Sequence, residues 1–172
     1  MKILLFGLIG SGKTTVGQAL AKELNADFIE MDAVTLERSG FDSTEEVYAV
    51  RRSLWQELEL DVSRDISTHA NATVVACSGD IVENELNLEY FRENSAALHI
   101  VYLKASPEVL AKRIIGSHPQ ATQSDQERIT NNIQQLFNDR NELYTSHSMT
   151  VIDTDNLLPA DVVKQVLAEI QK

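Results

Sequence analysis

Cysteine and proline are scarce in this chain, whose 172 residues include one cysteine, Cys77, and three prolines. A disulfide requires two cysteines, so no bridge within the chain can stabilise the fold. A chain of this length buries enough apolar surface to fold without one. We therefore expect a single domain over residues 1–172, a buried Cys77 with no chemistry of its own, and a reducing location such as the cytoplasm.

Positive charge is scarce as well, and long apolar runs are missing. Fifteen Lys and Arg residues stand against 26 Asp and Glu residues, which gives a formal net charge of −11. No cluster of basic side chains is long enough to follow a phosphate backbone, so nucleic acid is excluded as a main partner. No run approaches the roughly 18 apolar residues of a membrane span. We expect no nucleic-acid or membrane partner, and a monomer or a weak dimer.

The apolar run at the N-terminus is too short for a secretory signal. It extends from Ile3 to Ile9 after the charged Lys2, is interrupted by Gly10-Ser11-Gly12, and is followed by Lys13 where a signal would continue. We therefore interpret the segment as part of the fold.

Short apolar runs alternate with longer segments of helical periodicity, which predicts an α/β fold with a buried parallel sheet. The expected strands are Lys2–Phe6, Asp27–Glu30, Thr73–Cys77, Leu98–Leu103 and Met149–Asp153. The expected helices are Lys13–Leu24, Asp32–Ser39, Thr44–His69, Glu83–Asn94, Pro107–Ile115, Gln126–Ser146 and Pro159–Gln171.

One polar segment, Gly116–Asp125, lacks apolar periodicity. A segment of this kind inside a compact domain is more often a mobile lid than a plain linker, so we expect a lid here. Trp55 falls at helical spacing with Leu54 and Leu58, which favours a core position over a ligand platform. The four histidines share no spacing typical of a zinc site.

A phosphate-binding motif follows the first expected strand. Gly7, Gly12, Lys13 and Thr14 match the pattern G-x-x-x-x-G-K-[ST], between a strand and a helix as the mechanism requires. Glycines allow backbone N–H groups to turn toward an anion, and the helix N-terminus adds positive potential. Lys13 is predicted to reach the β- and γ-phosphates of ATP, and Thr14 to bind Mg²⁺. The expected nucleotide-binding residues of the loop are Gly7, Gly10, Ser11, Gly12, Lys13, Thr14 and Thr15.

The loop indicates a nucleotide but leaves the reaction open among small-molecule kinases, GTPases and motor-type ATPases. The chain has no [NT]-K-x-D guanine-reading motif. The strand Thr73–Cys77 continues into Ser78-Gly79-Asp80 instead of ending in an acid as in motor ATPases. The compact size and the expected lid favour a kinase, because a kinase must exclude water from the transferring phosphoryl group.

Nearly the whole chain resembles the shikimate kinase family. The resemblance rests on the phosphate-binding loop and on four further stretches: Phe28–Asp32, Gly79–Val82, Val101–Pro107 and Asn138–Tyr144. It implies a P-loop, three-layer α/β/α fold with a five-stranded parallel sheet, and transfer of the γ-phosphoryl group of ATP to a substrate hydroxyl, with Mg²⁺.

The resemblance also implies roles for single residues. Glu30 would support the metal together with Thr14, and Asp32 would hold the acceptor hydroxyl and help remove its proton. An acid in the position of Asp32 is also a common helix cap, which remains an alternative. Arg140 would bind the acceptor's carboxylate, because arginine binds carboxylates in a bidentate way. Arg113 would stack on adenine, unless it is an ordinary surface arginine.

Several residues depart from the family pattern. Only Gly79 remains of a glycine triplet that reads Ser78-Gly79-Asp80 here. Asp80 would repel an anionic acceptor unless Arg140 and one of Arg51 and Arg52 outweigh it. Arg51 and Arg52 do not align with the family's second clamp arginine unless a gap is introduced. We keep Arg51, Arg52, Gly79 and Asp80 as candidate substrate-binding residues.

The expected lid lacks the arginine that the family offers to the transferring phosphoryl group. No Lys or Arg occurs from Gly116 to Gln126, so Arg128 would have to swing in, or the rate would fall by orders of magnitude. Three alternatives to a shikimate kinase therefore stay open. They are a gluconate-type kinase, suggested by Cys77-Ser78 although such kinases lack the 138–144 stretch, a nucleoside or nucleotide kinase, and a degenerate ATP-binding regulatory module.

Overall fold

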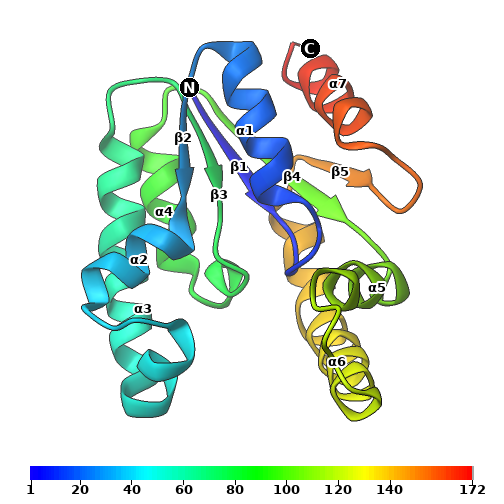
Figure 1. Ribbon diagram of the computed structural model, residues 1–172. Helices are drawn as coiled ribbons and strands as arrows, with labels where there is room; N and C mark the ends of the chain where they lie inside the picture. The colour runs from blue at the N-terminus through cyan, green and yellow to red at the C-terminus, as the bar shows by residue number, and fades with distance from the viewer. Residues whose placement is uncertain (172) are drawn as a thin grey trace.

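The computed structural model describes residues 1–171, in which five parallel strands form one sheet (Figure 1). The sheet order is β2-β3-β1-β4-β5, so β1 lies in the centre. The strands are β1 (Lys2–Phe6), β2 (Asp27–Glu30), β3 (Thr73–Ala76), β4 (Leu98–Lys104) and β5 (Thr150–Asp153). The predicted parallel α/β sheet is confirmed, and strand ends differ from the prediction by no more than one residue.

Within residues 1–171, six α-helices and one 3₁₀ turn connect the strands, and a seventh α-helix follows the last strand. The helices are α1 (Lys13–Leu24), α2 (Met31–Ser39), α3 (Thr44–Thr68), α4 (Glu85–Asn94), α5 (Pro107–Ser117), α6 (Gln123–His147) and α7 (Pro159–Ile170), with η1 (Ile81–Glu83) before α4. We predicted that α4 would begin at Glu83. It begins two residues later because the side chain of Asn84 accepts a hydrogen bond from the Leu86 N–H and caps the helix there.

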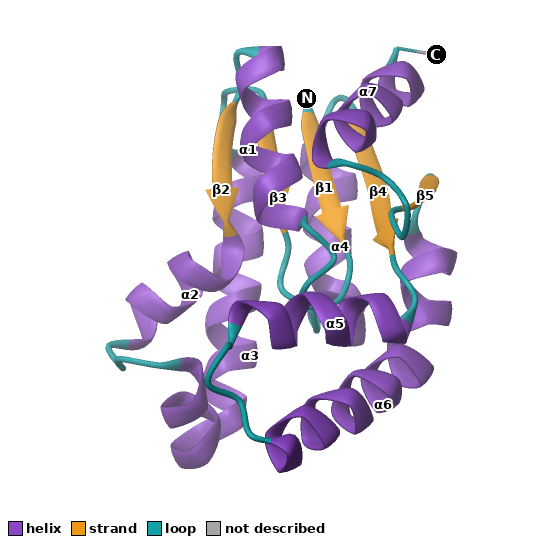
Figure 2. Cartoon of the chain, turned by 45° about the vertical axis from the view of Figure 1, so that its right-hand side comes forward, coloured by secondary structure: helices purple, strands orange, loops and turns teal. Residues whose placement is uncertain are grey.

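The sheet is buried between two helical layers (Figure 2). Side chains of β1 alternate between them: Ile3 and Leu5 pack toward α1 and α7, whereas Leu4 and Phe6 pack toward α3, α4 and α6. All five residues of β1 are buried. The parallel sheet predicted from the apolar runs and the three-layer arrangement implied by the family resemblance are therefore confirmed. Within residues 1–171, no helix is both long and apolar enough to cross a membrane.

The polar segment that we predicted to be a ten-residue lid is shorter. Helix α5 continues to Ser117 and α6 begins at Gln123, which leaves only residues 118–122 between them. Helix α6 starts early because Thr122 and Asp125 form a capping box: Thr122 Oγ1 accepts from the Asp125 N–H at 3.2 Å, and Asp125 Oδ2 accepts from the Thr122 N–H at 3.1 Å.

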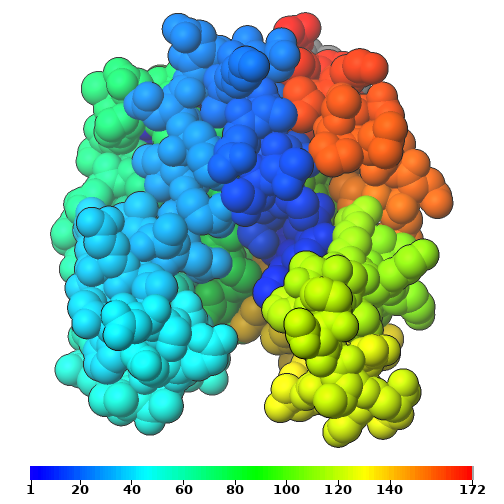
Figure 3. Space-filling view, in the orientation of Figure 1, coloured from blue at the N-terminus to red at the C-terminus, as the bar shows by residue number. Residues whose placement is uncertain are grey.

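The loops at the carboxyl ends of the strands open into a cleft. The pairs α2–α3 and α5–α6 extend beyond this edge of the sheet, and the space-filling view shows the hollow between them (Figure 3). The chain leaves β1 at this edge, between β3 and β4, where the direction of strand order reverses. Open α/β sheets bind their ligands at such a point, so the fold places the phosphate-binding loop at the floor of the cleft.

Candidate active site

The loop between β1 and α1 has the backbone of an anion cradle. Gly7, Gly10 and Gly12 have φ values of 148°, 82° and 96°, which side-chain-bearing residues rarely adopt. At Gly7 a Cβ atom would also lie 2.8 Å from the carbonyl oxygen of Leu103. Helix α1 begins at Lys13, directly after the third of these glycines, so its free N–H groups face the cradle.

Lys13 folds back over this loop. Its Nζ donates hydrogen bonds to the carbonyl oxygens of Gly7 at 2.8 Å and Leu8 at 3.3 Å. Burial lowers the pKa of the Lys13 ammonium, and the charges of Asp32 and Glu30 oppose that shift. These two neighbouring acids therefore help to keep the lysine protonated at the mouth of the loop.

Thr14 and Glu30 place two oxygen groups next to the loop. Thr14 Oγ1 donates to Glu30 Oε2 at 2.6 Å. Oxygen ligands of this kind suit a hard cation such as Mg²⁺. Within residues 1–171, no group of three or more His, Cys, Asp or Glu side chains could hold a metal ion. A cation beside Thr14 and Glu30 would therefore draw most of its ligands from phosphate oxygens and water.

A cavity of about 680 Å³ surrounds the loop and extends to α5 and the segment after β5. Arg113 of α5 lies in its wall and is fixed in place: it donates to the carbonyl oxygens of Thr154 at 2.7 Å and Gly10 at 3.3 Å. Arg113 is therefore a built part of the cavity and not a free surface arginine. Our sequence reading missed Thr154, which carries no motif. The predicted loop residues Gly10, Ser11, Gly12, Lys13, Thr14 and Thr15 all line this cavity, and Gly7 lies behind them.

Asp32 stands at the start of α2, which follows β2 without a connecting residue. The residue that precedes α2 is Glu30, and its side chain makes no capping hydrogen bond, so neither acid serves as a cap. Burial raises the pKa of Asp32, whereas the nearby Ser78 hydroxyl and the charge of Lys13 lower it. The carboxyl faces the cleft, and its surroundings have increased its basicity.

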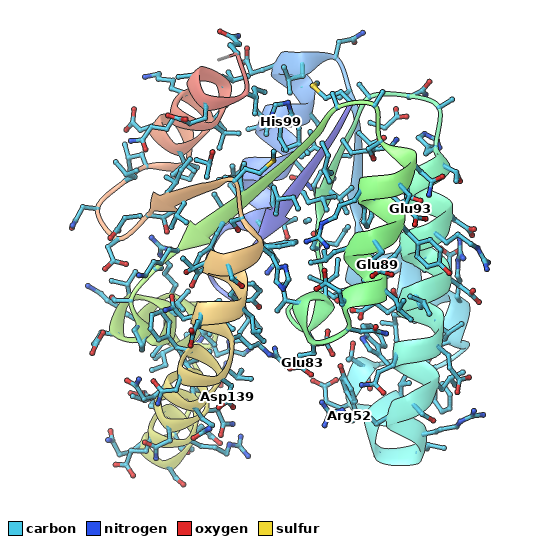
Figure 4. All side chains as sticks on the ribbon, turned by 180° about the vertical axis from the view of Figure 1, so that it is seen from behind. Arg52, Glu83, Glu89, Glu93, His99 and Asp139 are labelled. Carbon is cyan, nitrogen blue, oxygen red and sulfur yellow. The ribbon has the colours of Figure 1, made fainter. Side chains whose placement is uncertain are left out.

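A second cavity, of about 630 Å³, lies between α3 and α6. Arg140 of α6 lines it, with only 15% of its side chain exposed, and binds Glu83 through Nε at 2.8 Å. Tyr144, one turn further along α6, donates a hydrogen bond to the carbonyl oxygen of Gly79 and so joins the β3 loop to the helix. Figure 4 shows Glu83 in the opening between the two helices, with Arg52 on the α3 side.

The structure separates the two arginines that the sequence left as alternatives. Arg52 lines the second cavity and lies 3.5 Å from Glu83. Arg51 lies outside both cavities, is 57% exposed, and binds Glu57 of its own helix at 2.9 Å. The reason is a break in α3: Arg51 has φ −160° and ψ 89°, which turns the two neighbouring side chains apart.

The expected replacement for a lid arginine is not near the loop. Arg128 is 72% exposed and pairs with Asp125 at 3.0 Å on the first turns of α6. Of residues 118–122, between α5 and α6, His118 lines the first cavity, around the loop, which we call the nucleotide-side cavity. Its Nδ1 lies 2.9 Å from the carbonyl oxygen of Ile114.

Three side chains of the second cavity and its floor escaped the sequence reading. Tyr48 lines the cavity, Glu83 binds both of its arginines, and Glu59 is buried behind it. Only Glu59 carried a usable signal, because it is an acid at core spacing between Trp55 and Val62. Trp55 is buried as predicted, and it also forms part of the cavity wall.

Comparisons with known proteins agree on one family. The shikimate kinase family model matches residues 9–171. Shikimate kinase of Enterococcus faecalis is 29% identical over 99% of this chain and 98% of its own length. That of Marinomonas sp. is 31% identical over 99% of this chain and 92% of its own. The solved structure of the Acinetobacter baumannii enzyme in complex with shikimate superimposes with a TM-score of 0.82 over 99% of this chain and 92% of that one, at 22% identity.

This agreement covers the chain from the phosphate-binding loop to α7, and the loop, the fold and the cleft are those of a kinase. The protein is thus an ATP-dependent phosphotransferase whose acceptor is a hydroxyl group, and it belongs to the shikimate kinase family.

Proposed function

We propose that the chain transfers the γ-phosphoryl group of ATP to a hydroxyl group of shikimate. One observation carries the proposal: the two cavities share the side chains of Asp32 and Arg140 in their walls. Phosphoryl transfer requires a donor and an acceptor site that meet at one point, where attacking and leaving oxygens can align. Asp32 and Arg140 mark that point here.

The residues around this point have complementary tasks. Asp32 orients the acceptor hydroxyl and takes its proton, and its raised pKa suits it to do so. Lys13 and the amides of the loop stabilise the charge on the transferring group, because the lysine and the free N–H groups at the start of α1 both lie at the loop. Arg113 holds the nucleotide end of the cavity.

Mg²⁺ would lie beside Thr14 and Glu30, whose oxygens are 2.6 Å apart. Thr14 would bind it directly and Glu30 through water. The ion would supply charge neutralisation between the β- and γ-phosphates.

The acceptor's carboxylate would bind Arg140, with Arg52 as a second cation on the opposite wall. Arg51 has no part in this proposal, since it pairs with Glu57 on the outer surface of α3. The name of the Acinetobacter baumannii relative and the shikimate in its structure support this choice of acceptor.

The test is an ADP-release assay with MgATP and a panel of acceptors: shikimate, gluconate, other sugar acids, nucleosides and nucleoside monophosphates. We expect turnover with shikimate and a phosphorylated product in the mass spectrum. Turnover with gluconate or a nucleoside alone would replace shikimate as the acceptor. ATP binding with no turnover on any acceptor would support the alternative of a degenerate regulatory module. The absence of a lid arginine is the observation that favours this alternative.

A further inference from the structure

In the second cavity, between α3 and α6, which we call the acceptor-side cavity, the arginines form ion pairs and two of the acids do not, among the residues that the structure describes. Its two arginines, Arg52 and Arg140, both bind Glu83, at 3.5 Å and 2.6 Å. Its buried-side acids, Asp32 and Asp80, form no salt bridge with any side chain of residues 1–171. Glu83 thus partly neutralises the two arginines, whereas the end of the cavity formed by the loop after β3 carries an acid, Asp80, with no ion-pair partner in the described part of the chain.

Asp80 is held in a defined position at this end of the cavity. Tyr48 of α3 donates its hydroxyl to Asp80 Oδ2 at 2.8 Å. The Tyr48 ring itself is fixed, with its centroid 5.7 Å from that of Trp55 and the guanidinium of Arg52 5.9 Å from it. Burial and the charge of Asp80 raise the pKa of Tyr48, so the phenol remains a donor. A carboxylate has about four acceptor positions, and Tyr48 uses one of them.

Glu59 lies behind Asp80, buried in the core. Its side chain is 2% exposed, its Oε2 accepts from Asn87 Nδ2 at 2.9 Å, and its Oε1 has no hydrogen-bond partner in residues 1–171. Burial and the charge of Asp80 raise the pKa of Glu59 to about 8. Two adjacent carboxyls do not both ionise readily, so the buried Glu59 holds its proton at neutral pH and adds no second negative charge beside Asp80.

A fixed carboxylate with unused acceptor positions, at the wall of a polar cavity, is suited to bind hydroxyl groups. We propose that Asp80 determines acceptor specificity: it accepts hydrogen bonds from hydroxyl groups of the acceptor, and its charge disfavours a carboxylate at that end of the cavity. The proposal rests on the acceptor site assigned under Proposed function. It predicts that the wild-type chain discriminates against the charge of an acidic polyol more strongly than a chain without the Asp80 carboxylate.

The test compares shikimate with its methyl ester, which keeps the hydroxyl groups and lacks the charge. Binding is followed by the fluorescence of Trp55, the only tryptophan of the chain and part of the cavity wall, and by titration calorimetry. The variants are Asp80→Asn, which removes the charge and keeps the shape, and Asp80→Gly, which removes both. Asp61→Asn is the control, because it removes an exposed carboxylate of α3 that pairs with Arg64 and lines neither cavity.

We expect Asp80→Asn to bind the acid more tightly relative to the ester. The dissociation constant of the ester divided by that of the acid should therefore be roughly tenfold higher than in wild type. Asp80→Gly should give the same shift and also weaken binding of the ester, since a hydroxyl partner is lost. A ratio within twofold of the Asp61→Asn value would overturn the proposal, as would failure of both ligands to bind wild type and Asp80→Asn in calorimetry. Absence of turnover with any acceptor bears on the proposed function alone, because the ratio is a binding measurement.

Discussion

The ammonium group of Lys13 lies 2.8 Å from the carbonyl oxygen of Gly7, across the mouth of the loop that both residues belong to. Two carbonyl oxygens of the loop thereby hold a positive charge beside it before any phosphate is bound. Such pre-organised charge stabilises a transition state without reorganisation during the reaction.

Lys13→Met should abolish this contribution. We expect kcat to fall by about 100-fold or more in the ADP-release assay, with the thermal midpoint little changed. Lys22→Met, at an exposed position of the same α1 helix, should behave as wild type. A Lys13→Met protein that turned over at the normal rate would remove the loop lysine from the mechanism.

Arg140 of α6 and Arg51 of α3 can serve as test and control, because Arg140 is mostly buried in the cavity wall and Arg51 is exposed outside it. Arg140→Met should raise KM for an acidic acceptor by roughly 10- to 100-fold, because a charge-assisted hydrogen bond is lost, and should change kcat less. Arg51→Met, which breaks only a surface pair with Glu57, should leave both constants unchanged. Equal effects of the two substitutions on KM would contradict the placement of Arg140 in the acceptor site.

His118 offers a test of the missing lid cation. It lines the nucleotide-side cavity, and no Lys or Arg occurs between Gly116 and Gln126. His118→Arg should raise kcat by about tenfold or more if its guanidinium reaches the transferring phosphoryl group. Asn132→Arg adds the same charge on the exposed part of α6 and should have no effect. No gain from His118→Arg, measured at saturating substrates, would show that the lid already provides what the reaction needs.

Glu59 should make stability depend on pH. Its pKa rises from the ordinary 4.5 to about 8 on folding, through burial and the neighbouring charge of Asp80. The native state then binds more protons than the unfolded state, so the free energy of unfolding falls as pH rises from about 4.5 to about 8. Each unit of pKa difference corresponds to about 1.4 kcal/mol.

Glu59→Gln removes this titration and keeps the acceptor for Asn87. Its gain in stability over wild type, from urea denaturation, should therefore increase between pH 5 and pH 8.5. Glu57→Gln, an exposed position two residues away, is the control and should follow the wild-type profile. Parallel profiles for wild type and Glu59→Gln would mean that Glu59 does not hold its proton in the native state. Tyr48 and Cys77 are the other titratable groups that interact with Glu59, and burial raises the pKa of both, so neither competes with it in this range.

The donor half of the site could be predicted from sequence because it is local. Gly7 to Thr14 is one continuous loop, and its glycines, lysine and threonine have their functions in consecutive positions. The same holds for Glu30 and Asp32, which lie at the end of one short strand. Sheet class and layer order followed from the apolar alternation, which depends on residues near one another in the chain.

The acceptor half could not be predicted in the same way, because it is made by tertiary contacts. Tyr48 meets Asp80 across 32 positions of sequence, and Arg140 meets Glu83 across 57. The choice between Arg51 and Arg52 depends on a break in α3 that no residue type announces. The lid boundary is different: Thr122 and Asp125 form a recognisable capping signal, and reading it would have started α6 at the correct place.

Because β2 passes directly into α2, one short junction fixes the relative positions of the two halves of the site. One residue separates Glu30 from Asp32, yet Glu30 bonds to Thr14 on the nucleotide side and Asp32 lines the acceptor cavity. An inserted residue at this junction would rotate Asp32 by about 100° around the helix axis and leave Glu30 in place. The spacing between Glu30 and Asp32, and with it the distance between the proposed metal and acceptor sites, is therefore set by the length of this junction. The junction should tolerate substitution far better than a change in length.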